Sequence, residues 1–127
     1  MKRILIVDDD EDNLEILSKE LTSSGYEISV AQDGPTAIFQ AKVIKPQLII
    51  LDILIPKING VEVSQHLKQD PTTKDIPIIF LTMLRRRDDP SYIPESAVGA
   101  HLVLAKPIDL KELNYHVNHL LNKESGS

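Results

Sequence analysis

The sequence predicts an α/β fold, with one doubly wound (βα)5 domain built around a five-stranded parallel sheet. Short apolar runs rich in Ile, Leu and Val recur along the 127 residues, and most of them do not alternate with polar residues. Such runs are typical of strands buried on both faces of a parallel sheet. Segments with apolar residues at helical spacing separate the runs. This alternation implies right-handed crossovers with helices on both faces of the sheet.

Five runs mark the expected strands. Four are apolar and lie at residues 4–7, 48–51, 76–81 and 101–105. The fifth run, at residues 26–31, is weaker and alternates, which predicts a strand at the edge of the sheet. Ligands of doubly wound sheets bind at the carboxyl ends of the strands, so the residues that directly follow these runs are candidates for a functional site.

Four helices are predicted from apolar residues at helical spacing. Gly25 and Pro46 are stop signals after the first two, and Asp109 is the expected N-cap of the last. A further helix is expected between Thr82 and Gly99, but short or displaced, because two prolines interrupt this segment. The apolar positions that define the four helices are Leu14, Leu17 and Leu21; Ala37, Ala41 and Ile44; Val63 and Leu67; and Leu110, Leu113, Val117 and Leu120.

Composition excludes several classes of function. The formal net charge of −5 argues against direct nucleic-acid binding, which needs clusters of Lys and Arg. The chain has no cysteine, which excludes disulfides, thiolate catalysis and cysteine metal sites. No apolar run approaches the ~20 residues of a membrane span and no signal peptide opens the chain, so a cytoplasmic location is expected. Residues 1–122 are expected to form the domain, and residues 123–127 a disordered tail or a cloning remnant.

Five consecutive acidic residues, at positions 8–12, directly follow the first apolar run. Like charges at close range raise one another's pKa values, so such a cluster needs a positive partner. Asp52, Thr82 and Lys106 end or follow three other predicted strands. The carboxyl ends of parallel strands share one edge of the sheet, so these side chains are expected to lie near the acidic cluster.

A calcium loop and a helix cap are two interpretations of the acidic cluster. A calcium loop would use Asp8, Asp10 and Asp12. However, Asn13 and Lys19 stand where its glycine and its bidentate glutamate are needed. Acidic residues also stabilise a helix N-terminus, by ~0.3–1 kcal/mol each. Capping alone leaves unexplained why an aspartate and a lysine end other strands at the same edge.

A third interpretation is a phosphatase of the haloacid-dehalogenase type. Asp8 and Asp10 would then be nucleophile and acid/base, with Thr82 and Lys106 contacting the phosphate. Such an enzyme expects a further acidic pair after a later strand, and the sequence beyond Lys106 supplies none.

The fourth interpretation rests on a set of motifs in order along the chain. These are Ile4-Leu5-Ile6-Val7-Asp8-Asp9, Leu48-Ile49-Ile50-Leu51-Asp52-Ile53-Leu54-Ile55-Pro56, Asn59-Gly60, Phe80-Leu81-Thr82 and Lys106-Pro107. With them, the chain resembles the receiver domains of bacterial two-component response regulators over about residues 2–122. Each motif alone is weak, but their common order at the expected strand ends makes the signal specific.

The resemblance implies a phosphoacceptor signalling domain with the flavodoxin-like strand order 2-1-3-4-5. Asp52 would accept a phosphoryl group from the phosphohistidine of a histidine kinase or from a phosphotransfer protein. Mg²⁺ would be bound by Asp9, by Asp52 and by the backbone carbonyl of Leu54, and by Asp8 mostly through water. Magnesium suits such oxygen ligands and offsets the repulsion between a carboxylate and an anionic phosphoryl group.

The resemblance also assigns the two residues that would contact the transferred oxygens. Lys106 would pair with one phosphoryl oxygen, from a Lys106–Pro107 bond that is often cis in the family. The hydroxyl of Thr82 would donate to another oxygen once Asp52 is modified. Such a domain is a signalling module rather than an enzyme, and it acts on a downstream protein partner that the sequence does not identify.

Two positions depart from the family pattern. The residue after Thr82 is commonly small, but here it is Met83; and Val103 stands where an aromatic residue commonly reports phosphorylation. These departures favour an alternative, a receiver-like interaction module that acts without phosphorylation through a patch around Tyr92 and Ile93. Retention of the acidic pair, the phosphoacceptor, the threonine and the lysine favours the phosphorylated switch.

Overall fold

The computed structural model describes residues 2–83 and 102–122. The helix expected between Thr82 and Gly99, the patch around Tyr92 and the tail at residues 123–127 lie outside the described residues. The elements, in chain order, are β1 (Arg3–Val7), α1 (Glu11–Ser23), β2 (Glu27–Ala31), α2 (Gly34–Ile44), β3 (Leu48–Asp52), α3 (Gly60–Gln69), β4 (Ile78–Met83), β5 (Leu102–Lys106) and α4 (Leu110–Asn122).

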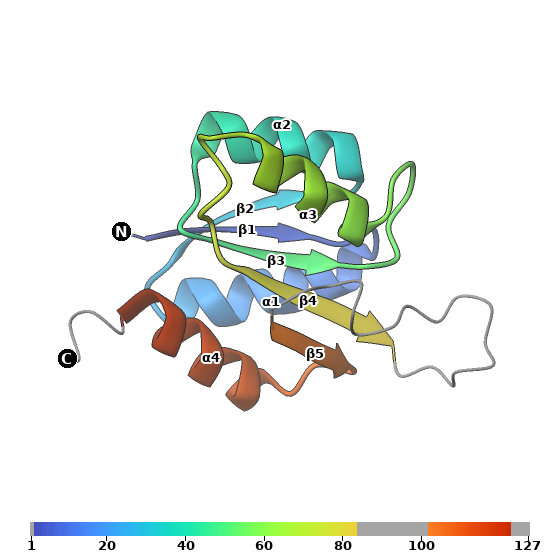
Figure 1. Cartoon of the computed structure of the whole chain (residues 1–127). Coiled ribbons are helices and arrows are strands. Elements are labelled where there is room, and N and C mark those ends of the chain that lie inside the picture. Colours follow the sequence, from blue (N-terminus) through green and yellow to red (C-terminus); the bar gives the residue numbers. More distant parts are fainter. Residues whose placement is uncertain (1, 84–101, 123–127) are drawn as a thin grey trace.

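The five strands form one sheet in the order β2-β1-β3-β4-β5, and all four neighbouring pairs are parallel. Helices α2 and α3 cover one face of the sheet, and α1 and α4 cover the other (Figure 1). The predicted doubly wound fold and its strand order are therefore confirmed. The expected edge strand at residues 26–31 is β2, which lies at one edge of the sheet.

Two apolar cores lie on the two faces of the sheet, and the central strands divide their side chains between them. Leu5 and Val7 of β1 belong to the core beneath α2 and α3, whereas Ile4 and Ile6 belong to the core beneath α1 and α4. Every residue of β3 is buried. The non-alternating apolar runs thus arise because β1 and β3 bury both of their faces.

Short polar side chains begin the helices. The side chain of Asp33 accepts a hydrogen bond from the backbone N–H of Thr36 at the start of α2, at 2.8 Å. Asn59 accepts one from the backbone N–H of Glu62 at the start of α3, at 2.9 Å. The predicted N-cap of α4 is confirmed, because Asp109 accepts from the backbone N–H groups of residues 111 and 112. Each such cap satisfies backbone donors that have no partner within the helix.

Strand β4 begins two residues later than its apolar run predicts. Proline has no backbone N–H, so Pro77 cannot donate to a sheet ladder. The Pro77 carbonyl accepts a hydrogen bond from the N–H of Ile49, whereas the N–H of Ile76 donates back to the carbonyl of Thr73 in the preceding turn. The strand therefore starts at Ile78 and extends to Met83, one residue beyond Thr82.

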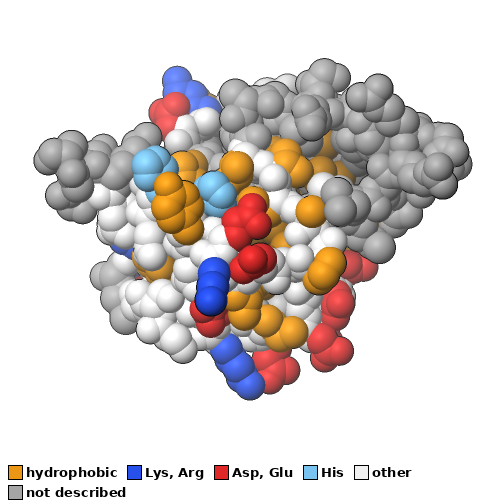
Figure 2. Space-filling model, turned by 90° about the horizontal axis from the view of Figure 1, so that it is seen from below, with side chains coloured by type: hydrophobic (Ala, Val, Ile, Leu, Met, Phe, Trp, Pro, Cys, Tyr) orange, Lys and Arg blue, Asp and Glu red, His pale blue; other side chains and the backbone are white. Residues whose placement is uncertain are grey.

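The face formed by α1 and α4 carries hydrophobic, acidic, basic and histidine side chains in mixture (Figure 2). Within residues 2–83 and 102–122, no helix has both the length and the apolar character needed to cross a membrane.

Candidate functional site

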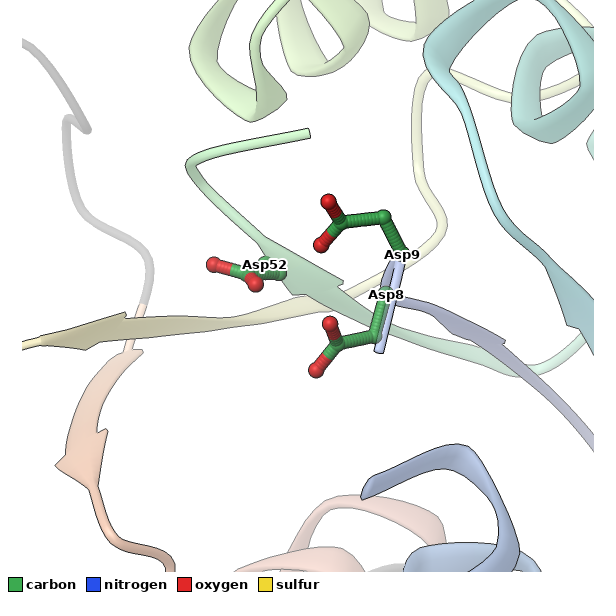
Figure 3. Close-up of side chains that lie close together, drawn as sticks. All are labelled: Asp8, Asp9 and Asp52. Atoms are coloured by element: carbon green, nitrogen blue, oxygen red, sulfur yellow. The ribbon is translucent and has the colours of Figure 1, made fainter. Parts of the chain in front are cut away.

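Three carboxylates meet at the carboxyl ends of two neighbouring interior strands. Asp8 and Asp9 directly follow β1, and Asp52 is the last residue of the neighbouring strand β3. One oxygen of each side chain lies within 4.8 Å of an oxygen of each of the others. Figure 3 shows the three side chains reaching from these two strand ends into the same space. The register explains the meeting, because Val7 of β1 pairs with Leu51 of β3, one residue before each acid.

Lys106 brings a positive charge to these carboxylates from the far edge strand. Its Nζ atom donates hydrogen bonds to Oδ2 of Asp52 at 2.7 Å and to Oδ2 of Asp8 at 3.0 Å. Lys106 ends β5, which is separated from β3 by β4. The peptide bond between Lys106 and Pro107 is cis, as expected.

Asp8 is fully buried and has three hydrogen-bond donors. The backbone N–H of Asp10 donates to its Oδ1 at 3.0 Å, and the side-chain amide of Asn13 donates to its Oδ2 at 2.5 Å. Lys106 is the third donor. Burial by itself raises the pKa of Asp8, but these three hydrogen bonds outweigh burial, and the pKa lies below its ordinary value. Asp8 is therefore held in its charged form.

Asp52 is buried, and its surroundings oppose its ionisation. Burial raises its pKa, the hydrogen bond from Lys106 lowers it, and the negative charge of Asp8 raises it again. The backbone N–H of Leu54 also donates to Asp52 Oδ1, at 3.2 Å. The net pKa is about 6, against an ordinary value of 3.8.

An ion pair by itself raises the pKa of its lysine and lowers the pKa of its aspartate, because it favours the charged form of each. In this site the pKa values of Lys106 and of Asp52 are both raised. Burial lowers the pKa of Lys106, but its hydrogen bonds to Asp52 and Asp8 outweigh burial. The lysine therefore stays charged. Asp52 gains less from the pair because two carboxylates share one ammonium group. The site retains an excess of negative charge that a cation would offset.

The donor set fits a magnesium ion. Magnesium takes oxygen ligands and is usually held by one or two carboxylates together with several waters. Asp8, Asp9 and Asp52 offer carboxylate oxygens close enough to one another to surround one ion. Asp9 is exposed, which leaves its side of the group open to solvent.

The other predicted site residues lie around this group. Thr82 is half-buried in β4, the strand between Asp52 and Lys106, and it pairs with Ala105 of β5. Leu54 follows β3 by two residues and contacts Asp52 through its backbone N–H. Met83 pairs in register with Lys106. The side chain of Met83 lies outside the described part of the chain. The geometry thus joins the acids with Lys106, and it places Leu54 and Thr82 beside them.

The departure at Val103 has a structural explanation. Val103 of β5 is half-buried and packs against the core beneath α2 and α3. It therefore contributes to the packing of an edge strand and does not present a large ring to solvent.

Helix α3 begins directly against the carboxyl end of β3, and this close approach explains Gly60. Its N–H donates to the carbonyl of Ile53 at 2.8 Å. A Cβ at this position would lie 2.6 Å from the carbonyl oxygen of Asp52 and 2.9 Å from Cα of Ile53. A glycine is therefore required at this position by the close approach of two backbone segments.

Two side chains next to the acidic pair have functions that sequence reasoning missed. Asp10 is exposed but also caps α1, because it accepts hydrogen bonds from the N–H groups of Asp12 and Asn13. It therefore turns toward α1, whereas a calcium loop or a phosphatase of the type considered above would need it beside Asp8. Asn13 was not singled out as a donor, and its side-chain amide reaches back from the first turn of α1 to Asp8.

The fold and the site define an α/β protein with a doubly wound parallel sheet, whose strand ends carry an acidic group and a lysine. Residues 4–118 match the family model described as "Response regulator receiver domain", and the chain belongs to this family. It is thus a receiver domain of the two-component signal-transduction systems. The family assignment and the acidic pair predicted from the sequence are both confirmed.

Curated relatives contain similar domains. The chain is 46% identical over 107 residues to the response regulator PleD of Caulobacter vibrioides. These residues make up 84% of this chain and 23% of PleD. It is 38% identical to RpaA of Synechocystis, named a DNA-binding dual master transcriptional regulator, over 97% of this chain and 50% of RpaA. The chain therefore spans half or less of the length of these relatives.

Solved structures agree with the fold. A response regulator from Chloroflexus aurantiacus superimposes with a TM-score of 0.82 at 36% identity, covering 94% of this chain and 97% of that one. The response regulator TrrA, solved in complex with the histidine kinase ThkA, gives a TM-score of 0.79 at 36% identity, covering 95% and 99% of the two chains.

Proposed function

We propose that Asp52 is the phosphoacceptor of this receiver domain and that the phosphoryl donor is the phosphohistidine of a histidine kinase or of a phosphotransfer protein. The observation that carries this proposal is the contact between Asp52 and Lys106, at 2.7 Å, within a group of three carboxylates. A relative of similar fold, TrrA, binds a histidine kinase. The donor would approach the carboxyl ends of the strands, where Asp9 is exposed.

The transfer exchanges one bond to phosphorus for another. A carboxylate oxygen of Asp52 forms a bond to phosphorus while the bond from phosphorus to the donor imidazole nitrogen breaks, and the released imidazole takes up a proton. The product is an acyl phosphate on Asp52. Lys106 is placed to pair with a phosphoryl oxygen, because its ammonium group already contacts the attacking carboxylate. Thr82 is assigned the role of donating to a second phosphoryl oxygen.

Magnesium is the proposed cofactor. Asp9, Asp52 and the backbone carbonyl of Leu54 would hold the ion directly, and Asp8 would contact it mostly through water. When bound, the ion supplies positive charge that offsets the repulsion between the carboxylate and the phosphoryl group. Asp8 is already fixed by three hydrogen bonds, so its charge is in place before the ion binds.

The proposed partners are proteins. The family is a signalling module, and we assign the chain no catalysis beyond assisting its own phosphorylation and slow dephosphorylation. A downstream protein would recognise the phosphorylated form. The name of RpaA includes DNA binding, but this chain spans half of RpaA and its net charge is −5. Direct contact with nucleic acid is therefore not proposed, and the cytoplasmic location stays a prediction.

Labelling with a small phosphodonor tests the proposal. Acetyl phosphate with Mg²⁺ should add one phosphoryl group to the native chain, and intact-mass spectrometry should detect it. Asp52→Asn should remain unlabelled. Asp75→Asn, at an exposed aspartate away from the carboxyl ends of the strands, should label like the native chain. Labelling that persists in Asp52→Asn would move the phosphoacceptor to another residue. A native chain that stays unlabelled would favour an interaction module that acts without phosphorylation.

A further inference from the structure

One oxygen of Asp8 is shared by two donors of different kinds. The amide of Asn13 lies 2.5 Å from Asp8 Oδ2, and the ammonium group of Lys106 lies 3.0 Å from the same atom. Asn13 is the third residue of α1, and its side chain is half-buried. A carboxylate oxygen has two lone pairs and accepts both hydrogen bonds.

The proposed phosphoryl transfer makes opposing demands on Lys106. Its ammonium group bridges Asp8 and Asp52 in the unmodified protein. A phosphoryl group on Asp52 brings new anionic oxygens that attract the lysine away from Asp8. Asp8 is fully buried, and a buried carboxylate oxygen that loses its donor raises the free energy of the protein. Turning Lys106 toward the phosphoryl group would therefore be opposed by Asp8 unless another donor stayed in place.

We propose that Asn13 is this donor and acts as a positioning residue for phosphoryl transfer. Its amide keeps Asp8 Oδ2 hydrogen-bonded while Lys106 turns from Asp8 to the phosphoryl group on Asp52. The amide carries no charge. It therefore donates a hydrogen bond to the oxygen and leaves the negative charge of Asp8 available to Lys106 or to a bound cation. This inference rests on the proposed function of Asp52.

A purely structural role in starting α1 does not require the Asn13 side chain. Asp10 caps the helix and accepts hydrogen bonds from the backbone N–H groups of Asp12 and Asn13, at 2.9 and 3.4 Å. These bonds use the backbone of Asn13. The side chain instead points to Asp8, which lies before the helix.

The sharing of one oxygen can be tested without metal or phosphodonor. Asn13→Leu, Lys106→Met and the double variant are unfolded in urea, and their midpoints are compared with that of the native chain. Each single variant leaves Asp8 Oδ2 one donor, and the double variant leaves it none. The double variant should therefore lose more than the sum of the two single shifts. Additive shifts would overturn the shared-oxygen argument.

The role in phosphoryl transfer is tested by labelling with acetyl phosphate at saturating Mg²⁺. Asn13→Leu should lower the limiting rate roughly tenfold, the effect of one lost hydrogen bond to a charged group. The Mg²⁺ affinity of the unphosphorylated protein, measured by titration calorimetry, should not change. Asn13→Gln, which keeps an amide donor, should recover part of the rate.

Asn114→Leu is the matched control. Asn114 is also a helical asparagine whose amide donates to a carboxylate, that of Glu20 at 2.6 Å, but it lies outside the acidic group. Its variant should label at the native rate. A native rate in Asn13→Leu, or a loss of Mg²⁺ affinity with an unchanged limiting rate, would overturn the positioning role alone. An unlabelled native chain would overturn the proposed function, and the positioning role with it.

Discussion

The carboxyl group of Asp52 lies between one carboxylate and one ammonium group, which act on it in opposite directions. Burial and the charge of Asp8 favour the protonated form of Asp52, whereas Lys106 favours the ionised form. Burial and Asp8 together outweigh Lys106. The folded pKa of about 6 lies above the ordinary value of 3.8. Between these two values the folded chain holds a proton on Asp52 that the unfolded chain has released. Without metal, the contribution of Asp52 to the free energy of unfolding is therefore fully present below pH 4, and it is lost as the pH rises through 6.

This linkage predicts the behaviour of Asp52→Asn. Asparagine has nearly the same shape and no charge, so the variant avoids the cost of ionising residue 52. Above pH 7 without metal it should be more stable than the native chain by on the order of 1–3 kcal/mol, since one pKa unit corresponds to about 1.4 kcal/mol. The difference should disappear near pH 4. Urea unfolding in a chelator from pH 4 to 8 measures it, with Asp75→Asn as control. A native chain more stable than the variant at pH 8 would contradict the assigned pKa.

At the scale of elements, the junction between β3 and α3 fixes where Asp52 can lie. Asn59 caps α3, and Gly60 brings the first turn of the helix against the backbone of Asp52 and Ile53. The atoms that a Cβ would meet are main-chain atoms of the last residue of the buried strand β3 and of the residue after it, which cannot move without the strand. The space beside Gly60 is therefore set by the strand that carries Asp52.

Gly60→Ala should disturb both stability and phosphorylation. The added methyl group must displace either α3 or the end of β3, and overpacking of this kind costs about 1–3 kcal/mol. A displaced strand end moves Asp52 relative to Lys106, so acetyl-phosphate labelling should slow as well. Gln65→Ala, at an exposed position of the same helix, serves as control for both measurements. A variant that unfolds at the native midpoint would show that the junction relaxes without cost.

The elements show what the sequence could reveal and what it could not. The apolar runs located all five strands because burial on both faces is a local property of a segment. The start of β4 was wrong by two residues, because the effect of Pro77 on the ladder outweighed the hydrophobicity of Ile76. The convergence of Asp8, Asp9, Asp52 and Lys106 followed from strand ends sharing one edge. Their individual roles came from the family resemblance.

The hydrogen-bond partners of Asn13 and Asp10 were not predicted from the sequence, whereas the cap of α4 by Asp109 was. Asn13 is one polar residue at the start of a helix, and nothing in its neighbours distinguishes a solvated amide from one that donates to Asp8. The same holds for Asp10, whose capping role depends on side-chain direction. Contacts of this kind require the three-dimensional arrangement, because each is made by a single side chain rather than by a periodic pattern.

At the scale of the whole molecule, the excess negative charge at the strand ends couples folding to cations. The three carboxylates converge only when β1 and β3 pair, so the unfolded chain has no equivalent group. A ligand that binds the folded form alone stabilises it by mass action, by about 1.4 kcal/mol at ten times its dissociation constant. Mg²⁺ should therefore raise the melting temperature of the native chain in a concentration-dependent way.

Asp9→Ala should remove most of that gain, because it removes the exposed carboxylate of the group. Asp12→Ala is the matched control, since Asp12 is also exposed and acidic but lies outside the convergent group. Thermal unfolding of the three proteins over a range of MgCl₂ concentrations, at constant ionic strength, makes the comparison. An equal response in all three would indicate screening of surface charge and would contradict the assigned site.

The interior position of β1 in the sheet determines when the pocket can be completed during synthesis. β1 is the first described strand to leave the ribosome, yet it pairs on both sides, with β2 and β3. Its second ladder must wait until translation has passed Asp52. β5 is the last strand, and it delivers Lys106 to Asp8, 98 residues earlier in the chain. A nascent chain that stops short of β5 therefore carries the acids without their cation, and the pocket on which the proposed phosphoryl transfer depends is complete only when the last strand has joined the sheet.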